Sequence, residues 1–183
     1  MGRVTRQTLE DLVRRRRARC ALLLVAVLLA SGCALQQLQF RIDHRVHIDS
    51  PRDRSRVNVP LKVSWSYRDF TVTGPDGGHD PHSGYFGVFV DQAPIPVGKN
   101  LRWVAHGDRS CLPSQGCPNA QYLANRYVYT TTQPSLVLSQ LPQLLAQQGI
   151  EHHEITVVLL DGSGDRLLES AWFVDFTYRR PSL

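Results

Sequence analysis

Hydrophobic and polar residues alternate in short runs along the chain after residue 43, and Gly, Pro, Asp and Ser separate the runs. The clearest run is Leu61–Tyr67 (LKVSWSY), in which every second side chain is apolar and those between are polar or charged. A period of two is typical of a strand that buries one face in a core. No amphipathic helical pattern longer than about two turns is present, so the folded part is predicted to consist mainly of strands.

Runs of the same kind follow at short intervals, and they predict strands at Tyr85–Asp91, Leu101–Ala105, Tyr127–Thr131, Ser135–Ser139, Glu154–Leu160 and Leu167–Tyr178. The run 154–160 ends apolar on both faces, as expected of a central strand. Residues 161–165 (DGSGD) have the composition of a hairpin loop, and residues 140–149 are expected to form a single helical turn. About seven to eight short strands that end in a hairpin predict an all-β sandwich.

Residues 1–32 are organised like a secretory signal peptide. Residues 1–19 are polar and rich in arginine, residues 21–30 are apolar, and small residues follow. As a helix, the apolar stretch would be about 15 Å long. A bilayer core is about 30 Å thick, so the stretch is too short for an ordinary transmembrane anchor.

The end of this leader, residues 29–33 (LASGC), resembles the lipobox of bacterial lipoproteins. In that family the cysteine receives a diacylglyceryl group and becomes the first residue of the mature chain, so the resemblance implies lipid attachment at Cys33. Two or more acyl chains hold a protein firmly at a membrane. The expected location is the extracytoplasmic side of the cell membrane, with residues 33–43 as a lipidated tether and residues 44–183 as the folded domain. An ordinary signal peptide or an uncleaved signal anchor is the alternative.

Charge separates the leader from the rest of the chain. Residues 1–32 hold seven arginines and two acidic residues, whereas residues 33–183 hold 14 basic and 14 acidic residues. The formal charge of +5 therefore belongs to the leader, where it would keep that segment on the cytoplasmic side during export. A domain without a basic excess is a poor match for nucleic acid, so no nucleic-acid partner is expected.

Two cysteines, Cys111 and Cys117, remain in the predicted domain. An exported domain meets an oxidising environment, so the pair is predicted to form a structural disulfide. Pro113 and Gly116 lie between the two cysteines and allow the chain to turn back on itself. A redox pair or half of a metal site is the alternative, but the spacing is not Cys-x-x-Cys and no second pair accompanies it.

Three stretches of the domain resemble fibronectin type III and related immunoglobulin-like domains. Residues 61–65 (LKVSW) resemble the second strand of that family, which implies that Trp65 is the core tryptophan. Residues 135–142 (SLVLSQLP) resemble the strand that ends in Leu-Pro before the family's long central strand. His153 stands where the family has its corner tyrosine, and the histidine departs from that pattern. The resemblance implies an immunoglobulin-like, fibronectin type III-like β-sandwich over residues 44–183.

Catalytic signatures are missing from the sequence. It has no glycine-rich phosphate loop, and Gly162-Ser163-Gly164 is not the Gly-x-Ser-x-Gly elbow of hydrolases. We therefore expect a non-catalytic protein without a cofactor, whose domain binds an envelope protein or polysaccharide. Strand aromatics usually lie in a core, but four of them are also candidates for a binding surface: Trp103, Tyr122, Tyr127 and Tyr129.

Histidines suggest an alternative function, that of an extracytoplasmic copper- or zinc-binding protein. His79 and His82 lie in the loop-like stretch 77–84 (GGHDPHSG), and His106 follows another predicted strand. Imidazole suits copper and zinc, and the ends of strands can bring loops together. The competing interpretation is that these histidines are solvated loop residues, because Gly, Asp and Pro are first of all turn formers.

Overall fold

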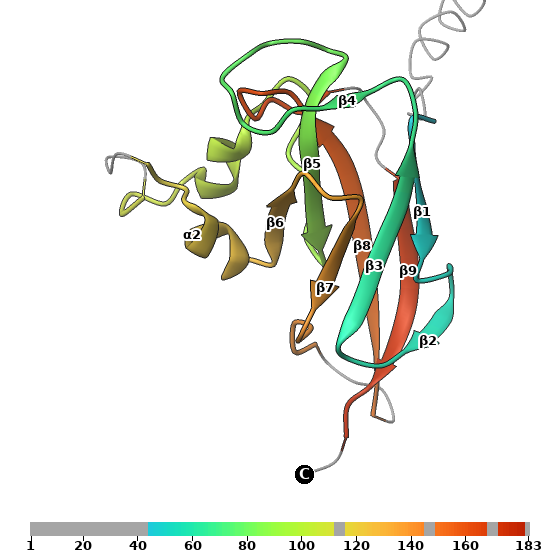
Figure 1. Ribbon diagram of the computed structural model, residues 1–183. Helices are drawn as coiled ribbons and strands as arrows, with labels where there is room; N and C mark the ends of the chain where they lie inside the picture. The colour runs from blue at the N-terminus through green and yellow to red at the C-terminus, as the bar shows by residue number, and fades with distance from the viewer. Residues whose placement is uncertain (1–43, 112–115, 145–148, 168–171, 182–183) are drawn as a thin grey trace, which may run out of the picture. The chain divides into compact units, whose positions relative to one another are not determined.

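A computed structural model describes residues 44–181 except for three gaps, 112–115, 145–148 and 168–171. The predictions for the signal peptide, the tether and lipid attachment at Cys33 lie outside the described residues. The described part contains nine strands, a 3-10 helix and a short α-helix (Figure 1). In chain order they are β1 Val46–Ser50, β2 Ser55–Val57, β3 Leu61–Tyr67, β4 Thr71–Val72, β5 Ser83–Val90, η2 Leu101–Ala105, α2 Ala120–Ala124, β6 Val128–Thr131, β7 Ser135–Leu138, β8 Ile150–Leu160 and β9 Trp172–Arg179. Neither of these helices is long and apolar enough to cross a bilayer.

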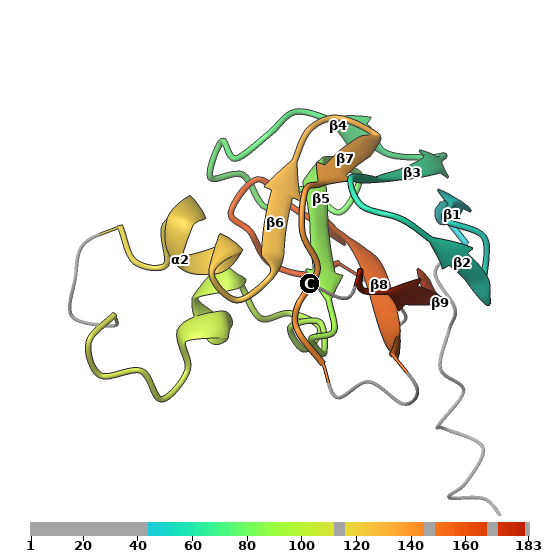
Figure 2. The ribbon, with the colours of Figure 1, turned by 90° about the horizontal axis from the view of Figure 1, so that it is seen from below.

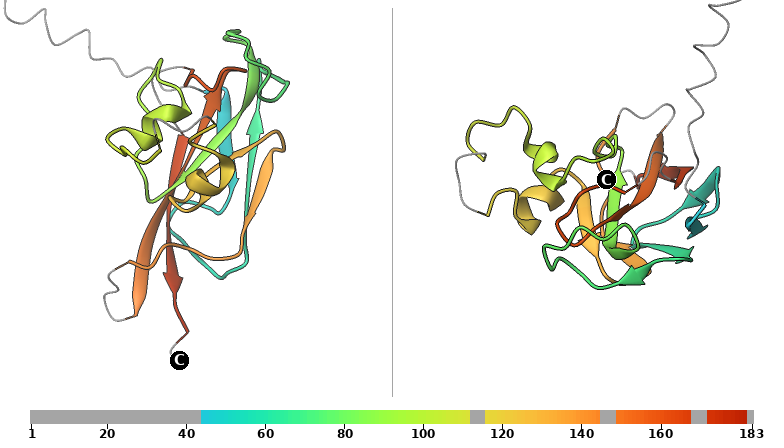
Figure 3. Two further views of the ribbon diagram at one scale, coloured as in Figure 1. Left: turned by 90° about the vertical axis from the view of Figure 1, so that its left-hand side faces the viewer. Right: turned by 90° about the horizontal axis from the view of Figure 1, so that it is seen from above.

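The strands form two sheets. One has three strands in the order β1-β3-β7, and the other has six, in which β2, β9, β8, β5 and β4 follow one another and β6 also pairs with β5. Neighbours are antiparallel except in the pairs β2–β9 and β4–β5. Seen from below, β7, β3 and β1 make one layer, and β5, β8 and β9 make the other (Figure 2). The side view also shows two layers (Figure 3), so the predicted all-β, sandwich-like architecture is confirmed.

The main core lies between the two sheets and contains the alternating apolar residues that the sequence pattern predicts. Val63 and Trp65 of β3 pack in one cluster with Phe86 of β5, whose ring meets Trp65 edge-on at 5.3 Å between centroids. Phe86 also contacts the rings of Tyr67 and Phe70, so it lies at the centre of an aromatic group. Tyr67 is 39% exposed, so the fully buried face of β3 ends one alternation earlier than predicted.

A second, smaller core covers the outer face of β5 and β8. Tyr85 and Phe89 alternate with the residues of the main core and pack here with Leu123 of α2. Leu101 and Val104 of η2 pack against the same cluster. The segment between β5 and β6, which carries η2 and α2, therefore packs against the outer face of the sheet. We call this segment the excursion.

Two local predictions are wrong. Leu101–Ala105 forms η2 instead of a strand, and Asn100 caps it by accepting a hydrogen bond from the Arg102 N–H at 3.1 Å. Its two packed residues are three positions apart, which places them on one side of a 3-10 helix. Residues 140–144, the first part of the expected helical turn, are not helical. Conversely, α2 forms where the sequence pattern predicts no element, and Asn119 caps it.

Candidate functional site

Three segments that are distant in sequence meet at one end of the sandwich, in the upper part of Figure 1. Backbone hydrogen bonds between residues 77–78 and 162–163 join the β4–β5 loop to the β8–β9 turn. The Arg166 N–H donates to the Lys99 carbonyl at 2.9 Å and joins the segment before η2 to the same turn. We call this surface the loop end; it comprises residues 76–79, 98–106 and 161–166.

A histidine and three oxygen-bearing side chains converge at the loop end. His79 Nδ1 lies 3.2 Å from Asp161 Oδ2 and 3.4 Å from Asp165 Oδ2. Ser163 Oγ lies 3.1 Å from the same nitrogen and 3.2 Å from Asp165 Oδ2. We call these four residues the His79 cluster. Its histidine and two aspartates are the group in the described part of the chain whose ligand atoms lie close enough to share a metal ion.

Asp161 is the most firmly oriented carboxylate of this cluster. Its Oδ1 accepts hydrogen bonds from the backbone N–H groups of Ser163 and Asp165, at 3.0 and 2.8 Å, and from the Ser163 hydroxyl at 2.7 Å. These bonds aim Oδ2 at His79, and the side chain is only 5% exposed. Burial raises the pKa of Asp161, but hydrogen bonds from Ser163, the Asp165 backbone and His79 outweigh burial and leave the pKa below its ordinary value. The carboxylate is therefore ionised at neutral pH.

The cluster contains the residue types of a catalytic triad without its geometry. In a triad, the serine hydroxyl and the carboxylate bind opposite nitrogens of the imidazole. Here Ser163 and Asp161 both lie against Nδ1 of His79, so the carboxylate cannot orient the imidazole as a base for the serine. The arrangement suits the binding of a cation better than nucleophilic catalysis.

Of the three histidines predicted as metal ligands, His79 alone belongs to the ligand group found among the described residues. His82 is exposed, and its backbone N–H donates to Asp80 Oδ1 at 2.9 Å. His106 stacks on Trp103 with ring centroids 4.5 Å apart. Asp161 and Asp165 of the β8–β9 turn, and not His82 and His106, complete the ligand group with His79. Sequence reasoning missed them because DGSGD matches the composition of a hairpin loop.

Cationic and aromatic side chains gather on η2 and on residues that flank it on both sides. Lys99, Arg102, Trp103 and His106 are all exposed, and we call these four residues the basic surface. Lys99 Nζ lies 5.5 Å from the centroid of the Trp103 ring, a cation–π arrangement. Trp103 is 39% exposed and stays a candidate for a binding surface, whereas Tyr127 packs against the main core. The basic surface brings two cations together on a domain whose formal charge is zero.

Two adjoining pockets open beside the basic surface. Their volumes are about 440 and 240 Å³, and Asn100 and Arg102 line both. Asp165 lines the smaller pocket and Ser163 lines the larger one. The pockets therefore connect the basic surface to the His79 cluster.

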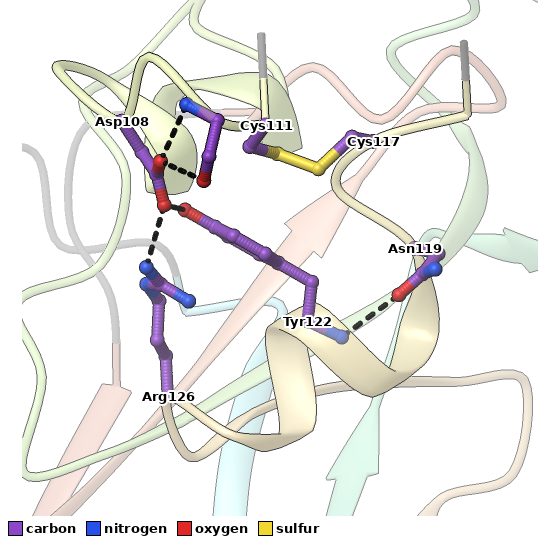
Figure 4. The surroundings of a disulfide bond; sticks show 7 residues. Asp108, Cys111, Cys117, Asn119, Tyr122 and Arg126 are labelled. Atoms are coloured by element: carbon purple, nitrogen blue, oxygen red, sulfur yellow. Dashed lines mark hydrogen bonds and ion pairs between the residues drawn. A yellow bond between two sulfur atoms is a disulfide. The ribbon is translucent and has the colours of Figure 1, made fainter. Parts of the chain in front are cut away.

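The disulfide between Cys111 and Cys117 (Figure 4) lies at the larger pocket, which Cys117 lines. The sulfur atoms of Cys111 and Cys117 are bonded, with their Cα atoms 5.4 Å apart, so the predicted pairing is confirmed. Cys117 and Pro118 line the pocket. The disulfide therefore holds the second half of the excursion beside the first.

Asp108 connects the same two parts of the excursion (Figure 4). It accepts hydrogen bonds from the Tyr122 hydroxyl at 2.8 Å and from the Arg126 guanidinium at 3.0 Å. Hydrogen bonds from Ser110 and Tyr122 hold the pKa of Asp108 at about 2. Tyr122 is thereby engaged in the structure of the excursion, and Tyr129 of β6 packs against the main core. Neither is free to extend the aromatic part of the basic surface.

A second histidine, His153, is buried between carboxylates near the start of β8. Its Nδ1 lies 2.7 Å from Asp91 Oδ2, and its Nε2 lies 3.2 Å from Glu151 Oε2. An ionised carboxylate only accepts hydrogen bonds, so each ring nitrogen of His153 faces an acceptor. Arg180 binds the two oxygens of Glu151 at 2.9 and 3.0 Å and, more than His153, holds the pKa of Glu151 below its ordinary value. The position of the expected corner tyrosine thus carries a charged network, which we assign a structural role.

Comparison of the chain with protein-family models, curated protein sequences and solved structures gave no match. Its function is therefore inferred from its own residues and their geometry. The basic surface and the His79 cluster are the described features that point most directly to a ligand.

Proposed function

We propose that the chain is a non-catalytic lipoprotein of the cell envelope, whose domain binds an anionic envelope polysaccharide at the basic surface. The observation that carries the proposal is the pairing of Lys99 and Arg102 around one pocket, next to exposed aromatic rings. Arginine recognises carboxylate and phosphate groups through its planar fork, and lysine adds a point charge. A polymer with acidic groups therefore complements this surface.

The rings of the basic surface favour a saccharide over a simple anion. The rings of Trp103 and His106 are stacked and parallel, and Trp103 is 39% exposed. Such rings supply a large, rigid apolar contact area beside polar groups. Arg102 lies between the two pockets, so an extended chain can contact both. A protein is the other class of partner expected from the sequence, and the binding test below distinguishes it from a polysaccharide.

The order of the longer strands supports an immunoglobulin-like fold for the domain. When the short β2 and β4 are set aside, the first, second and fifth strands form one sheet, and the third, sixth and seventh pair in the other. Immunoglobulin-like sandwiches divide their strands in this way. The fourth strand, β6, pairs with β5, at the edge where variable-type domains add strands to the second sheet. Trp65 is buried against Phe86, as the resemblance implies for a core tryptophan.

Lipid attachment at Cys33 is the part of the proposal that sets the location. The lipobox-like residues 29–33 support it, and the residues from Cys33 to the domain span at most about 35 Å when extended. The domain would therefore work close to the outer face of the membrane.

Radiolabelled palmitate tests the anchor in a bacterial host. The wild-type chain should carry label in the membrane fraction and start at Cys33, because the acylated cysteine becomes the mature N-terminus. Cys33→Ser should lose the label, whereas the control Cys20→Ser, which changes a cysteine inside the leader, should keep it. Label that persists in Cys33→Ser, or its absence from the wild type, contradicts the anchor.

Removal of two cations tests the binding site. Lys99→Ala/Arg102→Ala should weaken binding of hexagalacturonate, a carboxylated saccharide, by at least about 10-fold, since hydrogen bonds to charged groups are worth about 1.5–3 kcal/mol. The double variant Arg56→Ala/Lys62→Ala is a matched control, because it removes the same residue types from exposed positions on β2 and β3. Isothermal titration at low and physiological salt measures both.

The same titrations include the neutral sugar maltohexaose. Binding of maltohexaose as tight as that of hexagalacturonate, or an equal loss in both double variants, would overturn the proposed site. If neither saccharide binds the wild type, while an envelope protein is retained in a pull-down and lost with Lys99→Ala/Arg102→Ala, the saccharide is wrong and the protein alternative is supported.

A further inference from the structure

We propose that the His79 cluster is a zinc site, with His79 Nδ1, Asp161 Oδ2 and Asp165 Oδ2 as ligands and the Ser163 hydroxyl beside them. The inference does not rest on saccharide binding, because the ligands are not residues of the basic surface, although Ser163 and Asp165 also line the two pockets. It also differs from the ligand set expected from the sequence, because one loop histidine is joined by two aspartates of the β8–β9 turn.

The distances within the cluster match the edges of a small tetrahedron. Zinc binds histidine nitrogen and carboxylate oxygen at about 2.0–2.2 Å, which puts the ligand atoms of a tetrahedral site about 3.3–3.6 Å apart. The nitrogen of His79 lies 3.2 and 3.4 Å from the two aspartate oxygens. Ser163 Oγ lies 3.1 Å from that nitrogen and 3.2 Å from Asp165. Small shifts of side chains that are already adjacent would complete the site.

Hydrogen bonds alone do not account well for the way in which three oxygen atoms converge on Nδ1 of His79. Nδ1 of an imidazole carries at most one proton, and here three oxygen atoms surround it at 3.1–3.4 Å. Ser163 has a single hydroxyl proton to share among these acceptors, and its shortest contact is with Asp161 Oδ1, 2.7 Å from Oγ. A cation among the four atoms would give each of them a partner at once.

The cluster is oriented in the way that metal ligands usually are. Backbone N–H groups of the turn hold Asp161 Oδ1, so that Oδ2 faces His79 without further reorganisation. Outer-shell hydrogen bonds of this kind fix ligating carboxylates in metal sites. The His79 side chain is 69% exposed, so a metal ion has a route from solvent and water can complete its coordination.

The donor set selects among metals. Carboxylates alone suit magnesium or calcium, whereas an imidazole nitrogen favours zinc or copper. Copper(II) prefers square-planar or tetragonal surroundings, in which one ligand atom lies opposite the nitrogen and farther away than the others, whereas three oxygens lie at similar distances, 3.1–3.4 Å, from His79 Nδ1. Zinc is therefore the metal that fits both the atoms and their spacing.

Zinc titration of the full-length protein, purified in detergent without a histidine tag, tests the site. The wild type should take up about one zinc ion per chain and melt at a higher temperature with zinc than without it. His79→Ala and Asp165→Asn should each weaken zinc binding by at least about 10-fold and abolish the melting shift. His82→Ala is the matched control, an exposed histidine of the same loop, and should bind zinc as the wild type does.

Each alternative result overturns the site in a recognisable way. No zinc uptake by the wild type, or uptake that survives His79→Ala, removes the cluster as the ligand set. Equal losses in His79→Ala and His82→Ala would point to loose binding by loop histidines. Circular dichroism of the metal-free variants shows whether they are folded, and hexagalacturonate binding by His79→Ala separates failure of this site from failure of the proposed function.

Discussion

Replacement of His153 by alanine is expected to lower the free energy of unfolding by about 3–5 kcal/mol. The imidazole side chain is fully buried, and it lies between Asp91 and Glu151. Its removal leaves two largely buried carboxylates without the ring whose nitrogens lie 2.7 and 3.2 Å from them. Breaking a buried ion pair from one side is costly for this reason, whatever the net value of the intact pair.

The pH dependence distinguishes this mechanism from the loss of packing. The pKa of Glu151 is lowered in the folded protein, chiefly by Arg180 and less by His153, so its ionisation stabilises the fold above the ordinary pKa of 4.5. That stabilisation is lost as the pH falls through the folded pKa. In His153→Ala the carboxyl group loses part of this support, so the difference between variant and wild type should shrink on acidification. A cavity alone would give a difference that does not depend on pH.

Urea unfolding at several pH values measures this effect. His152→Ala is the matched control, because His152 lies on the same strand with an exposed side chain, and its change should stay within about 0.5 kcal/mol. A loss in His153→Ala below about 1 kcal/mol, or equal losses in the two variants, would show that the buried network does not stabilise the domain.

Replacement of Phe86 by alanine is expected to cost about 3–5 kcal/mol. Phe86 has no exposed surface, and its ring contacts Trp65, Tyr67 and Phe70 across the sandwich. The deletion removes apolar area from the core and leaves a cavity where both sheets meet. Because Trp65 is the residue that carries the resemblance to immunoglobulin-like domains, its surroundings also bear on the proposed fold.

Thermal and urea unfolding of Phe86→Ala and Phe173→Ala give the comparison. Phe173 lies on β9 and is 56% exposed, so its truncation should change the stability by less than about 1 kcal/mol. A near-neutral Phe86→Ala would mean that the two sheets do not share the core described here.

The fold follows from the sequence where one face of a strand is buried. β3 has the predicted bounds, and the buried face of β9 is the predicted one although β9 starts at Trp172 and not at Leu167, since a period of two reports a half-buried strand directly. β2 and β4, with three and two residues, are too short to produce a pattern. Leu101–Ala105 resembles a strand by composition, but its packing against a second core makes it helical. That core depends on tertiary contacts, which local patterning does not contain.

The candidate sites show the same limit more strongly. His79 was predicted as a ligand because histidines in loops stand out by residue type. Asp161 and Asp165 were not, because the contact of His79 with Asp161 joins residues 82 positions apart, and only the sheet topology brings them together. Nothing in the sequence distinguishes Lys99 and Arg102 from the other basic residues. The fold places both of them at one pocket.

Hydrogen exchange of the full-length protein, with and without hexagalacturonate, tests the proposed binding site most directly. Protection should appear in peptides that cover residues 98–106 and 161–166, because these segments line the two pockets. Peptides of β2 and the start of β3, at the opposite end of the sandwich, should exchange unchanged. Protection confined to that opposite end, or no protection at a saturating concentration, would contradict the account.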